Sequence, residues 1–124
     1  MIIVYDSLTG QTKRFVKKLG FNNVSILDYV ENDEPILLIT RSFNFGEIPP
    51  TTLNFLNQYA NKVIATCVSG NKNWGTNYGM AGVKIEQMFN IPLILKFEGS
   101  GFDQDVKLVQ NWINIYLRGK KNDK

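Results

Sequence analysis

The sequence Ile2-Ile3-Val4-Tyr5-Asp6-Ser7-Leu8-Thr9-Gly10-Gln11-Thr12 joins an apolar run to a polar, hydroxyl-rich turn. The run from Ile2 to Tyr5 is rich in β-branched residues, which is typical of a strand buried on both faces of a sheet. A helical pattern follows, because four residues share one face: Thr12, Phe15, Val16 and Leu19. Gly20 suits the end of this helix, where a left-handed residue is common. The stretch therefore predicts a strand, a polar turn and an amphipathic helix.

The rest of the chain repeats this alternation of apolar runs and helical patterns. Further strands are predicted at 24–27, 35–39, 63–68 and 93–95. A helix is predicted after Pro49-Pro50, with Thr51 or Thr52 near its cap and with an inward face of Leu53, Leu56 and Ala60. The next helix turns Ala81, Ile85, Met88 and Phe89 inward. The last helix, capped by Asp103 or Asp105, turns Val106, Val109, Ile113 and Leu117 inward.

Apolar strands separated by amphipathic helices predict an α/β fold, with a mainly parallel sheet covered on both faces. Five strands in a chain of this length suit the doubly wound, flavodoxin-like strand order 2-1-3-4-5. Only residues 28–34 separate the second and third strands, whereas a parallel crossover usually needs a dozen residues or more. We therefore expect the helix between these two strands to be shortened or missing.

Length and charge indicate one domain with a short basic tail. The 124 residues fit a single core, which we place at residues 1–117. Residues 118–124 carry a net charge of +3 and are expected to be frayed, whereas residues 1–117 are neutral overall. A nucleic-acid-binding domain usually concentrates positive charge on its folded body, so nucleic acid is not an expected partner.

Composition excludes several other classes of protein. The chain has no histidine and one cysteine, Cys67, so disulfide frameworks, histidine-based catalytic triads and Cys/His metal sites are excluded. No apolar run approaches the roughly 18 residues of a membrane span. The first residues lack a basic leader, and we expect a cytoplasmic protein with a reduced, buried Cys67.

The first candidate site is the turn Ser7, Leu8, Thr9, Gly10, Gln11 and Thr12. Backbone N–H groups at a helix N-terminus bind anions, the hydroxyls add donors, and glycine lets a ligand approach the backbone. We interpret the turn as a phosphate site that needs no Lys or Arg. The alternative is a hydroxyl-rich helix cap without a ligand.

Two aromatic loops are expected at the same edge of the sheet. The second loop contains Thr40, Ser42, Phe43, Asn44, Phe45 and Gly46, and its aromatic side chains either cover a flat ring or fold back into the core. The third loop contains Ser69, Gly70, Asn71, Asn73, Trp74, Gly75 and Tyr78, a glycine- and asparagine-rich backbone suited to binding the edge of a ligand. Together the three loops predict a pocket for a flat, phosphorylated ring, and flavin mononucleotide (FMN) is the candidate.

The quoted motifs resemble those of a known family. The turn at residues 7–12 is similar to the flavodoxin phosphate signature S/T-x-T-G-x-T. The elements Tyr5-Asp6-Ser7-x-Thr9-Gly10, Phe45-Gly46-x-x-Pro49, Ser69-Gly70-Asn71-x-Asn73-Trp74-Gly75 and Lys96-Phe97-Glu98-x-Ser100-Gly101 resemble the NrdI family across almost the whole chain. At two positions the chain departs from the usual pattern, since residue 41 is basic and residue 44 is Asn rather than Gly. Asn tolerates left-handed backbone better than most residues, whereas Arg41 either reaches the cofactor or faces solvent.

The resemblance implies an accessory FMN protein of class Ib ribonucleotide reductase. In that family, reduced FMN reacts with O2 to give superoxide or a related oxidant. The oxidant drives assembly of the dimanganese-tyrosyl radical cofactor in the reductase's radical-bearing subunit. The flavin carries the chemistry, so no catalytic residue and no metal ligand is expected in the chain. The expected partners are that subunit, O2 and an unidentified electron-donating reductase.

The main alternative is a general electron-transfer flavodoxin, which shares the fold and the cofactor. The predicted ring-contacting loops carry no acid between Thr40 and Gly46 or between Ser69 and Gly79. Carboxylates near the ring would disfavour an anionic reduced flavin, so their absence favours full reduction and the NrdI-like function. A receiver domain would need an acidic pair and a phospho-accepting Asp, and a low-molecular-weight phosphatase would need Arg six residues after Cys67, where Asn73 stands.

Overall fold

The computed structural model describes residues 1–122 and contains one sheet of five parallel strands. The strands are β1 (Ile2–Asp6), β2 (Asn23–Ser25), β3 (Ile36–Thr40), β4 (Val63–Gly70) and β5 (Leu93–Glu98). Their order is β2-β1-β3-β4-β5, and every neighbouring pair is parallel. All residues of β1 and β3 are buried, as the continuous apolar runs predict. The doubly wound flavodoxin-like fold is confirmed.

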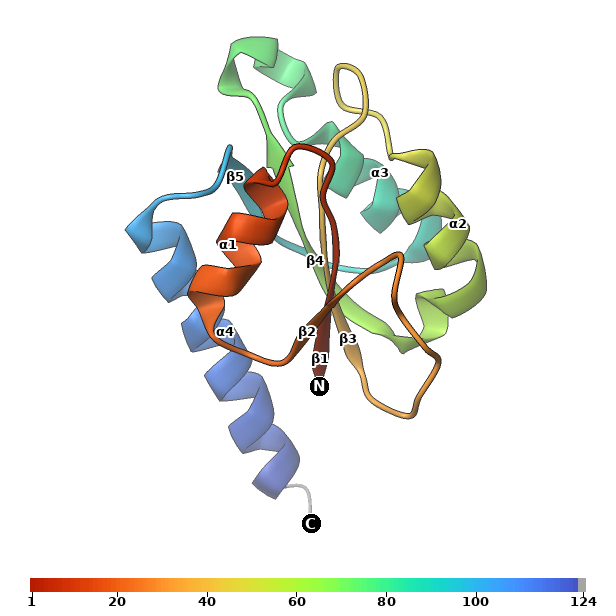
Figure 1. The fold of residues 1–124 in the computed structure, drawn as a ribbon, viewed down its shortest axis with the longest axis vertical. Helices are drawn as coiled ribbons and strands as arrows, with labels where there is room; N and C mark the ends of the chain where they lie inside the picture. Colours follow the sequence, from red (N-terminus) through yellow and green to blue (C-terminus); the bar gives the residue numbers. More distant parts are fainter. Residues whose placement is uncertain (123–124) are drawn as a thin grey trace.

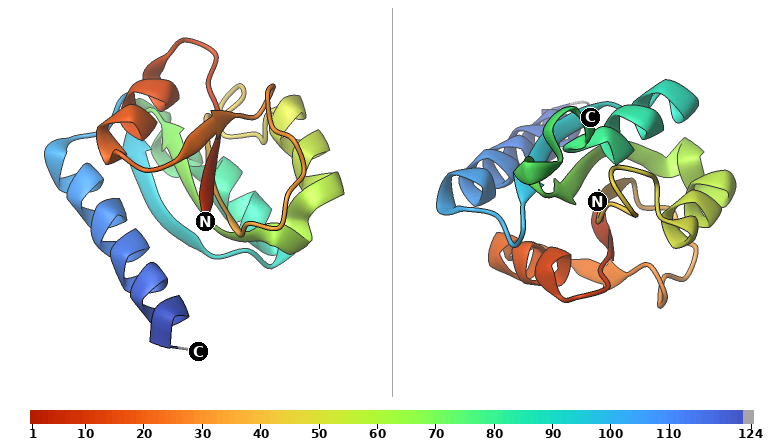
Figure 2. Two further views of the ribbon diagram at one scale, coloured as in Figure 1. Left: turned by 60° about the horizontal axis from the view of Figure 1, so that its bottom comes forward. Right: turned by 90° about the horizontal axis from the view of Figure 1, so that it is seen from above.

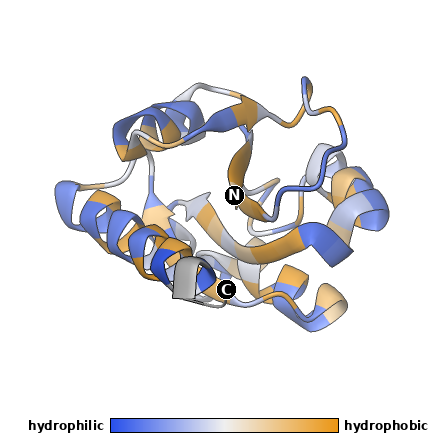
Figure 3. Cartoon of the chain, turned by 90° about the horizontal axis from the view of Figure 1, so that it is seen from below, coloured by the Kyte–Doolittle hydropathy of each residue, from blue (hydrophilic) through white to orange (hydrophobic). Residues whose placement is uncertain are grey.

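Two helices cover each face of the sheet (Figures 1 and 2). The helices α1 (Gln11–Leu19) and α4 (Asp103–Asn122) enclose one hydrophobic core, in which Phe15 and Phe97 stack with ring centroids 4.0 Å apart. The helices α2 (Pro50–Tyr59) and α3 (Met80–Phe89) enclose the other. Figure 3 shows the same layering as hydropathy, with mostly hydrophobic strands inside and mixed colours on the helices.

The connection between β2 and β3 contains no helix, which confirms the prediction from its length. Tyr29, in this connection, covers the part of the core that a helix would otherwise cover. Its ring packs edge-on against Phe55 and Tyr59 with centroid distances of 5.1 Å. One aromatic residue therefore closes this end of the second core while the backbone around it stays irregular.

Two details of the helix faces differ from the predictions. The helix α2 begins at Pro50, and its buried residues are Thr52, Phe55 and Leu56 rather than the predicted set of Leu53, Leu56 and Ala60. In α3, Met88 is 61% exposed instead of facing inward. Both helices are short, and over two or three turns an apolar pattern fits more than one rotation about the helix axis.

The last helix also differs from the predicted domain boundary. We expected a frayed tail from residue 118, but α4 continues as helix to Asn122 and projects beyond the body of the molecule in Figure 1. Residues 123 and 124 lie outside the described part of the chain. A basic sequence continues a helix readily, since Lys and Arg are good helix formers and interact favourably with a helix C-terminus.

Candidate functional site

The three predicted loops meet at the carboxyl edge of the sheet, at the top of Figure 1. They surround an open cleft of about 220 Å³. The cleft is lined by Leu8, Thr9, Gln11, Thr12, Arg41, Ser42, Ser69, Gly70, Asn71 and Trp74. Nine of these ten were predicted as site residues, and Arg41 is the addition. The cleft lies where ligands bind in open parallel sheets, beside the strand at which the order reverses.

The first loop leaves the N-terminus of α1 available to an anion. Gly10 is the N-cap residue with φ +92°, a left-handed conformation that favours glycine, and it has no side chain with which to cap the helix. Ser7 lies beside the turn, where its Oγ accepts a hydrogen bond of 3.2 Å from the backbone N–H of Lys13. The first turn of α1 contains no acidic side chain. The helix dipole and the free N–H groups therefore face the cleft without a competing carboxylate on this helix.

The second and third loops contact each other through aromatic side chains and close backbone packing. The Phe45 ring lies edge-on to Trp74 at a centroid distance of 6.2 Å. Phe45 is 70% exposed and Phe43 is 37% exposed, so neither folds fully back into the core. Gly46 lies so close to Asn77 that a Cβ atom would be 2.5 Å from the Asn77 carbonyl oxygen. The two loops thus form one aromatic-edged wall above the cleft.

Hydrogen bonds hold the base of this wall. The Ser42 hydroxyl donates to the carbonyl oxygen of Ser69 at 2.7 Å, and the Ser69 hydroxyl donates to the carbonyl oxygen of Gly99 at 2.9 Å. The Asn71 side chain accepts from the backbone N–H of Asn73 at 2.9 Å, which begins the 3₁₀ segment η2 (Lys72–Asn77). These bonds order the backbone of the second and third loops beside the cleft.

Several predicted site residues lie beside the cleft rather than along it. Asn44 has φ +51°, the left-handed conformation that asparagine tolerates, in a tight turn closed by paired backbone hydrogen bonds between Phe43 and Glu47. Thr40 is fully buried, and its hydroxyl bonds to the carbonyl oxygen of Arg41 and to Thr52. The other predicted residues that do not line the cleft are Ser7, Gly10, Phe43, Phe45, Gly46, Asn73, Gly75 and Tyr78.

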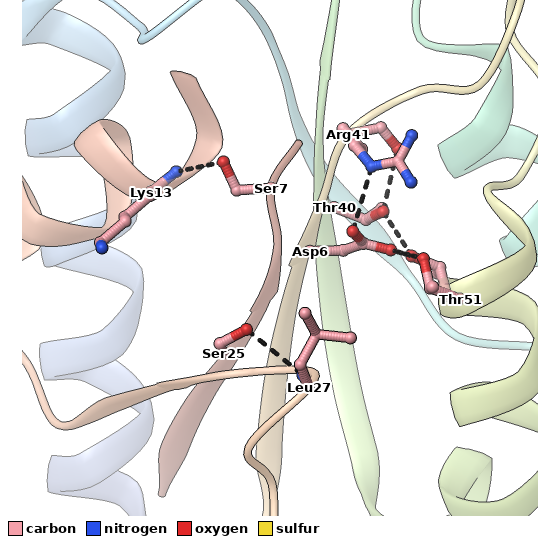
Figure 4. Close-up of polar contacts among 9 residues, drawn as sticks. Asp6, Ser7, Lys13, Ser25, Leu27, Thr40, Arg41 and Thr51 are labelled. Carbon is pink, nitrogen blue, oxygen red and sulfur yellow. Dashed lines mark hydrogen bonds and ion pairs between the residues drawn. The ribbon is translucent and has the colours of Figure 1, made fainter. Parts of the chain in front are cut away.

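A buried polar cluster that the sequence motifs do not indicate lies at the ends of β1 and β3 (Figure 4). The Asp6 side chain ends β1 and is only 5% exposed. One carboxylate oxygen accepts from Nε of Arg41 at 3.1 Å, and the other accepts from the hydroxyls of Thr51 and, at 2.7 Å, Thr52. Arg41 therefore does not simply face solvent, since its side chain is 19% exposed and paired with Asp6.

The same cluster explains where α2 begins. Its N-cap residue is Pro49, no side chain caps the helix locally, and no acid lies in its first turn. The Asp6 carboxylate, from β1, supplies the negative charge that a helix N-terminus favours and binds two hydroxyls of its first turn. A signal for this contact existed in the sequence, because Asp6 is a charge at the end of an apolar strand and required a partner.

The acidic side chains near this site lie outside the cleft lining. Of the described residues that line the cleft, none is acidic. Glu98, at the end of β5, accepts a hydrogen bond of 3.0 Å from the backbone N–H of Lys72 and so supports the third loop. Burial, together with the nearby charges of Asp105 and Glu98, raises the pKa of the Tyr78 hydroxyl, which therefore stays protonated.

Neither Cys67 nor a cluster of acidic side chains forms a second centre in the described part of the chain. Cys67 is fully buried, and this burial raises the pKa of its thiol, so it is not a reactive nucleophile. Among residues 1–122, no group of three or more His, Cys, Asp or Glu side chains is placed to bind a metal ion. Within the same residues, none of the helices has both the length and the apolar character needed to cross a membrane.

Comparison with protein families identifies a match over most of the chain. The family described as "NrdI Flavodoxin like" matches residues 3–111. Protein NrdI of Macrococcus caseolyticus is 44% identical over 108 residues, which cover 86% of this chain and 84% of the relative. The SPbeta prophage-derived protein NrdI of Bacillus subtilis is 42% identical over 127 residues, which cover 98% of this chain and 96% of the relative.

Comparison with solved structures supports the fold. Oxidised Flavodoxin 2 from Bacillus cereus superposes with a TM-score of 0.67 at 19% identity, covering 95% of this chain and 97% of that one. A Fusobacterium nucleatum flavodoxin bound to flavin mononucleotide gives a TM-score of 0.67 at 17% identity, covering 95% of this chain and 96% of that one. At these identities the likeness concerns architecture alone.

Proposed function

Because the chain belongs to the NrdI flavodoxin-like family, we propose that it binds FMN and serves class Ib ribonucleotide reductase. In this proposal the reduced protein supplies superoxide or a related oxidant for assembly of the dimanganese-tyrosyl radical cofactor. The observation that carries the proposal is the convergence of the N-terminus of α1, with Gly10 as its N-cap residue, and an aromatic-edged wall at one cleft. Its setting would be the cytoplasm, with an electron-donating reductase, O2 and the radical-bearing subunit as partners.

The residues of the first loop fit a phosphate monoester. The backbone N–H groups after Gly10 face the cleft at the positive end of α1, and Thr9 and Thr12 add hydroxyl donors beside them. Hydrogen bonds to an ionised acceptor are shorter and stronger than neutral ones. The Ser7 hydroxyl accepts from the N–H of Lys13, and a ligand phosphate would accept from the N–H groups of Gln11 and Thr12, which line the cleft.

The residues of the second and third loops fit a flat ring. Trp74 lines the cleft and Phe45 lies edge-on to it, so a ring bound between the loops would have an aromatic surface on one side. Gly70 and Asn71 line the same cleft, so their backbone groups are candidates for hydrogen bonds to the edge of the ring. The redox chemistry of the proposal comes from the bound FMN, whereas these residues bind and orient it.

The charges around the cleft fit a cofactor that becomes more negative on reduction. The described lining contains Arg41 and no acid, so the protein does not oppose negative charge on the ring by direct repulsion. An electron-transfer flavodoxin is the alternative, and it would pass electrons to a protein acceptor instead of O2.

The test is reconstitution of the radical cofactor. The protein is loaded with FMN, photoreduced without oxygen and mixed with the Mn(II)-loaded radical subunit of a class Ib reductase. Air is then admitted, and the tyrosyl radical is counted by electron paramagnetic resonance. We expect radical to form only with reduced protein and superoxide to be detected in the absence of the subunit. Reduction of a protein electron acceptor without any radical would instead identify an electron-transfer flavodoxin.

A further inference from the structure

Asp6 ends the strand that leads into the turn proposed to bind phosphate, and its carboxylate points toward the first turn of α2 (Figure 4). Asp6 is buried, with 3% of the residue exposed, and it directly precedes Ser7. A phosphate monoester carries a charge of about −1.5 to −2 at pH 7. An uncompensated carboxylate at this place would repel such a ligand through an interior that screens charge weakly. The N-terminus of α2 offsets part of this charge, and a full positive charge close to Asp6 would offset the rest.

Arg41 supplies that charge and also reaches the cleft. Its Nε donates to Asp6 at 3.1 Å, and the residue lines the cleft beside Ser42. Thr51 and Thr52 hold the second carboxylate oxygen, which fixes the position of the acid without changing its charge. In the part of the chain that the structure describes, Arg41 is the cation paired with Asp6. The carboxylate thus has two neutral partners and one charged partner.

We propose that Arg41 is a specificity-determining residue, which selects a phosphorylated flavin over a neutral one by cancelling the charge of Asp6. The inference rests on the proposed function, in which the turn at residues 7–12 binds the FMN phosphate. It goes beyond that function because it assigns a role to a pair that does not belong to the turn. In this proposal the Arg41–Asp6 pair changes FMN affinity through the electrostatic potential at the phosphate, and not through the stability of the fold.

The test compares the dissociation constants of FMN and riboflavin, because the two ligands share a ring and differ in the phosphate. The ratio of the riboflavin constant to the FMN constant is measured for the unmodified protein and for three variants. Arg41→Gln should lower this ratio at least tenfold, because Asp6 is left unpaired. Asp6→Asn should keep or raise the ratio. The double variant, which is neutral at both positions, should return the ratio to within about threefold of the starting value.

Controls separate charge from structure. Lys62→Gln removes a cation from the pair with Glu31 at 3.3 Å, outside the site, and should leave the ratio unchanged. Arg41→Lys keeps the charge and should keep most of the ratio even where Arg41→Gln is poorly folded. Urea denaturation without ligand reports folding for each variant.

Two results would overturn the inference, and a third would instead overturn the proposed phosphate site. Equal losses of FMN and riboflavin affinity in Arg41→Gln and in Asp6→Asn would show a purely structural role. An unchanged ratio in a well-folded Arg41→Gln protein would show no role in selection. If the unmodified protein itself binds FMN no better than riboflavin, the phosphate site at residues 7–12 is wrong.

Discussion

Replacing Gly46 with alanine should separate the second and third loops and weaken the folded state. Gly46 has φ +112°, and an added Cβ would lie 2.5 Å from the Asn77 carbonyl oxygen and 3.0 Å from Cβ of Met80. The backbone conformation costs alanine about 1–2 kcal/mol, and crowding a packed contact costs roughly 1–3 kcal/mol more. A less flexible unfolded chain offsets about 0.4–1 kcal/mol of this. We therefore expect urea denaturation to show a free energy of unfolding lower by about 2–4 kcal/mol.

Gly20→Ala is the matched control for this prediction. Gly20 has φ +78°, but no heavy atom lies within 4 Å of the position a Cβ would take. It shares the backbone penalty without the clash, so it should cost only about 1 kcal/mol. FMN affinity should fall in Gly46→Ala, because the contact between Phe45 and Trp74 depends on the loop position, and should be unchanged in Gly20→Ala. Equal stability losses in the two variants would refute the close packing of the loops.

Three further predictions concern the turn, the tight loop and the buried thiol. Thr9→Ala combined with Thr12→Val removes two donors to a charged acceptor, each worth about 1.5–3 kcal/mol; flavin fluorescence titration should show FMN affinity at least a hundredfold lower and riboflavin affinity nearly unchanged. Asn44 has φ +51°, so Asn44→Val should lower the free energy of unfolding by about 1–2 kcal/mol in urea denaturation, whereas Asn44→Gly should stay within about 0.5 kcal/mol of the unmodified protein. Burial raises the pKa of the Cys67 thiol, so above about pH 8.5 the unfolded chain loses a proton that the folded chain keeps. Stability in urea should therefore fall by up to about 1.4 kcal/mol per pH unit above that pH, and a Cys67→Ala protein with the same slope would contradict this.

The strands and the helix order could be predicted because they depend on local patterns. The apolar run at 35–39 is typical of a strand covered on both faces, and the strand Ile36–Thr40 is buried at every position. The missing helix between β2 and β3 followed from chain length alone. The rotations of α2 and α3 could not be predicted in the same way. Phe55 is buried and Met88 is exposed because of neighbouring elements, such as Tyr29, that the local pattern does not contain.

In the candidate site, too, some features depend on local sequence and others depend on the tertiary structure. The sequence by itself determined which loops carry hydroxyls, glycines and aromatic residues, and the rule for parallel sheets placed these loops at one edge. Of the nineteen residues predicted to bind the cofactor, nine line the cleft and ten lie outside its lining. These features depend on local chemistry. The conformational freedom of Gly10 and the aromatic surface of Trp74 belong to the residues themselves, wherever their loops lie.

Only the tertiary structure decided the partners of the charges. Asp6 and Arg41 are 35 residues apart, and Thr51 is 45 residues from Asp6, so no local pattern relates them. They meet because β1 and β3 are neighbours in the sheet, with Asp6 in register with Thr40, and because α2 begins above that edge. A buried carboxylate must find its compensating groups wherever the fold brings them, and this requirement is satisfied only after the strands have paired.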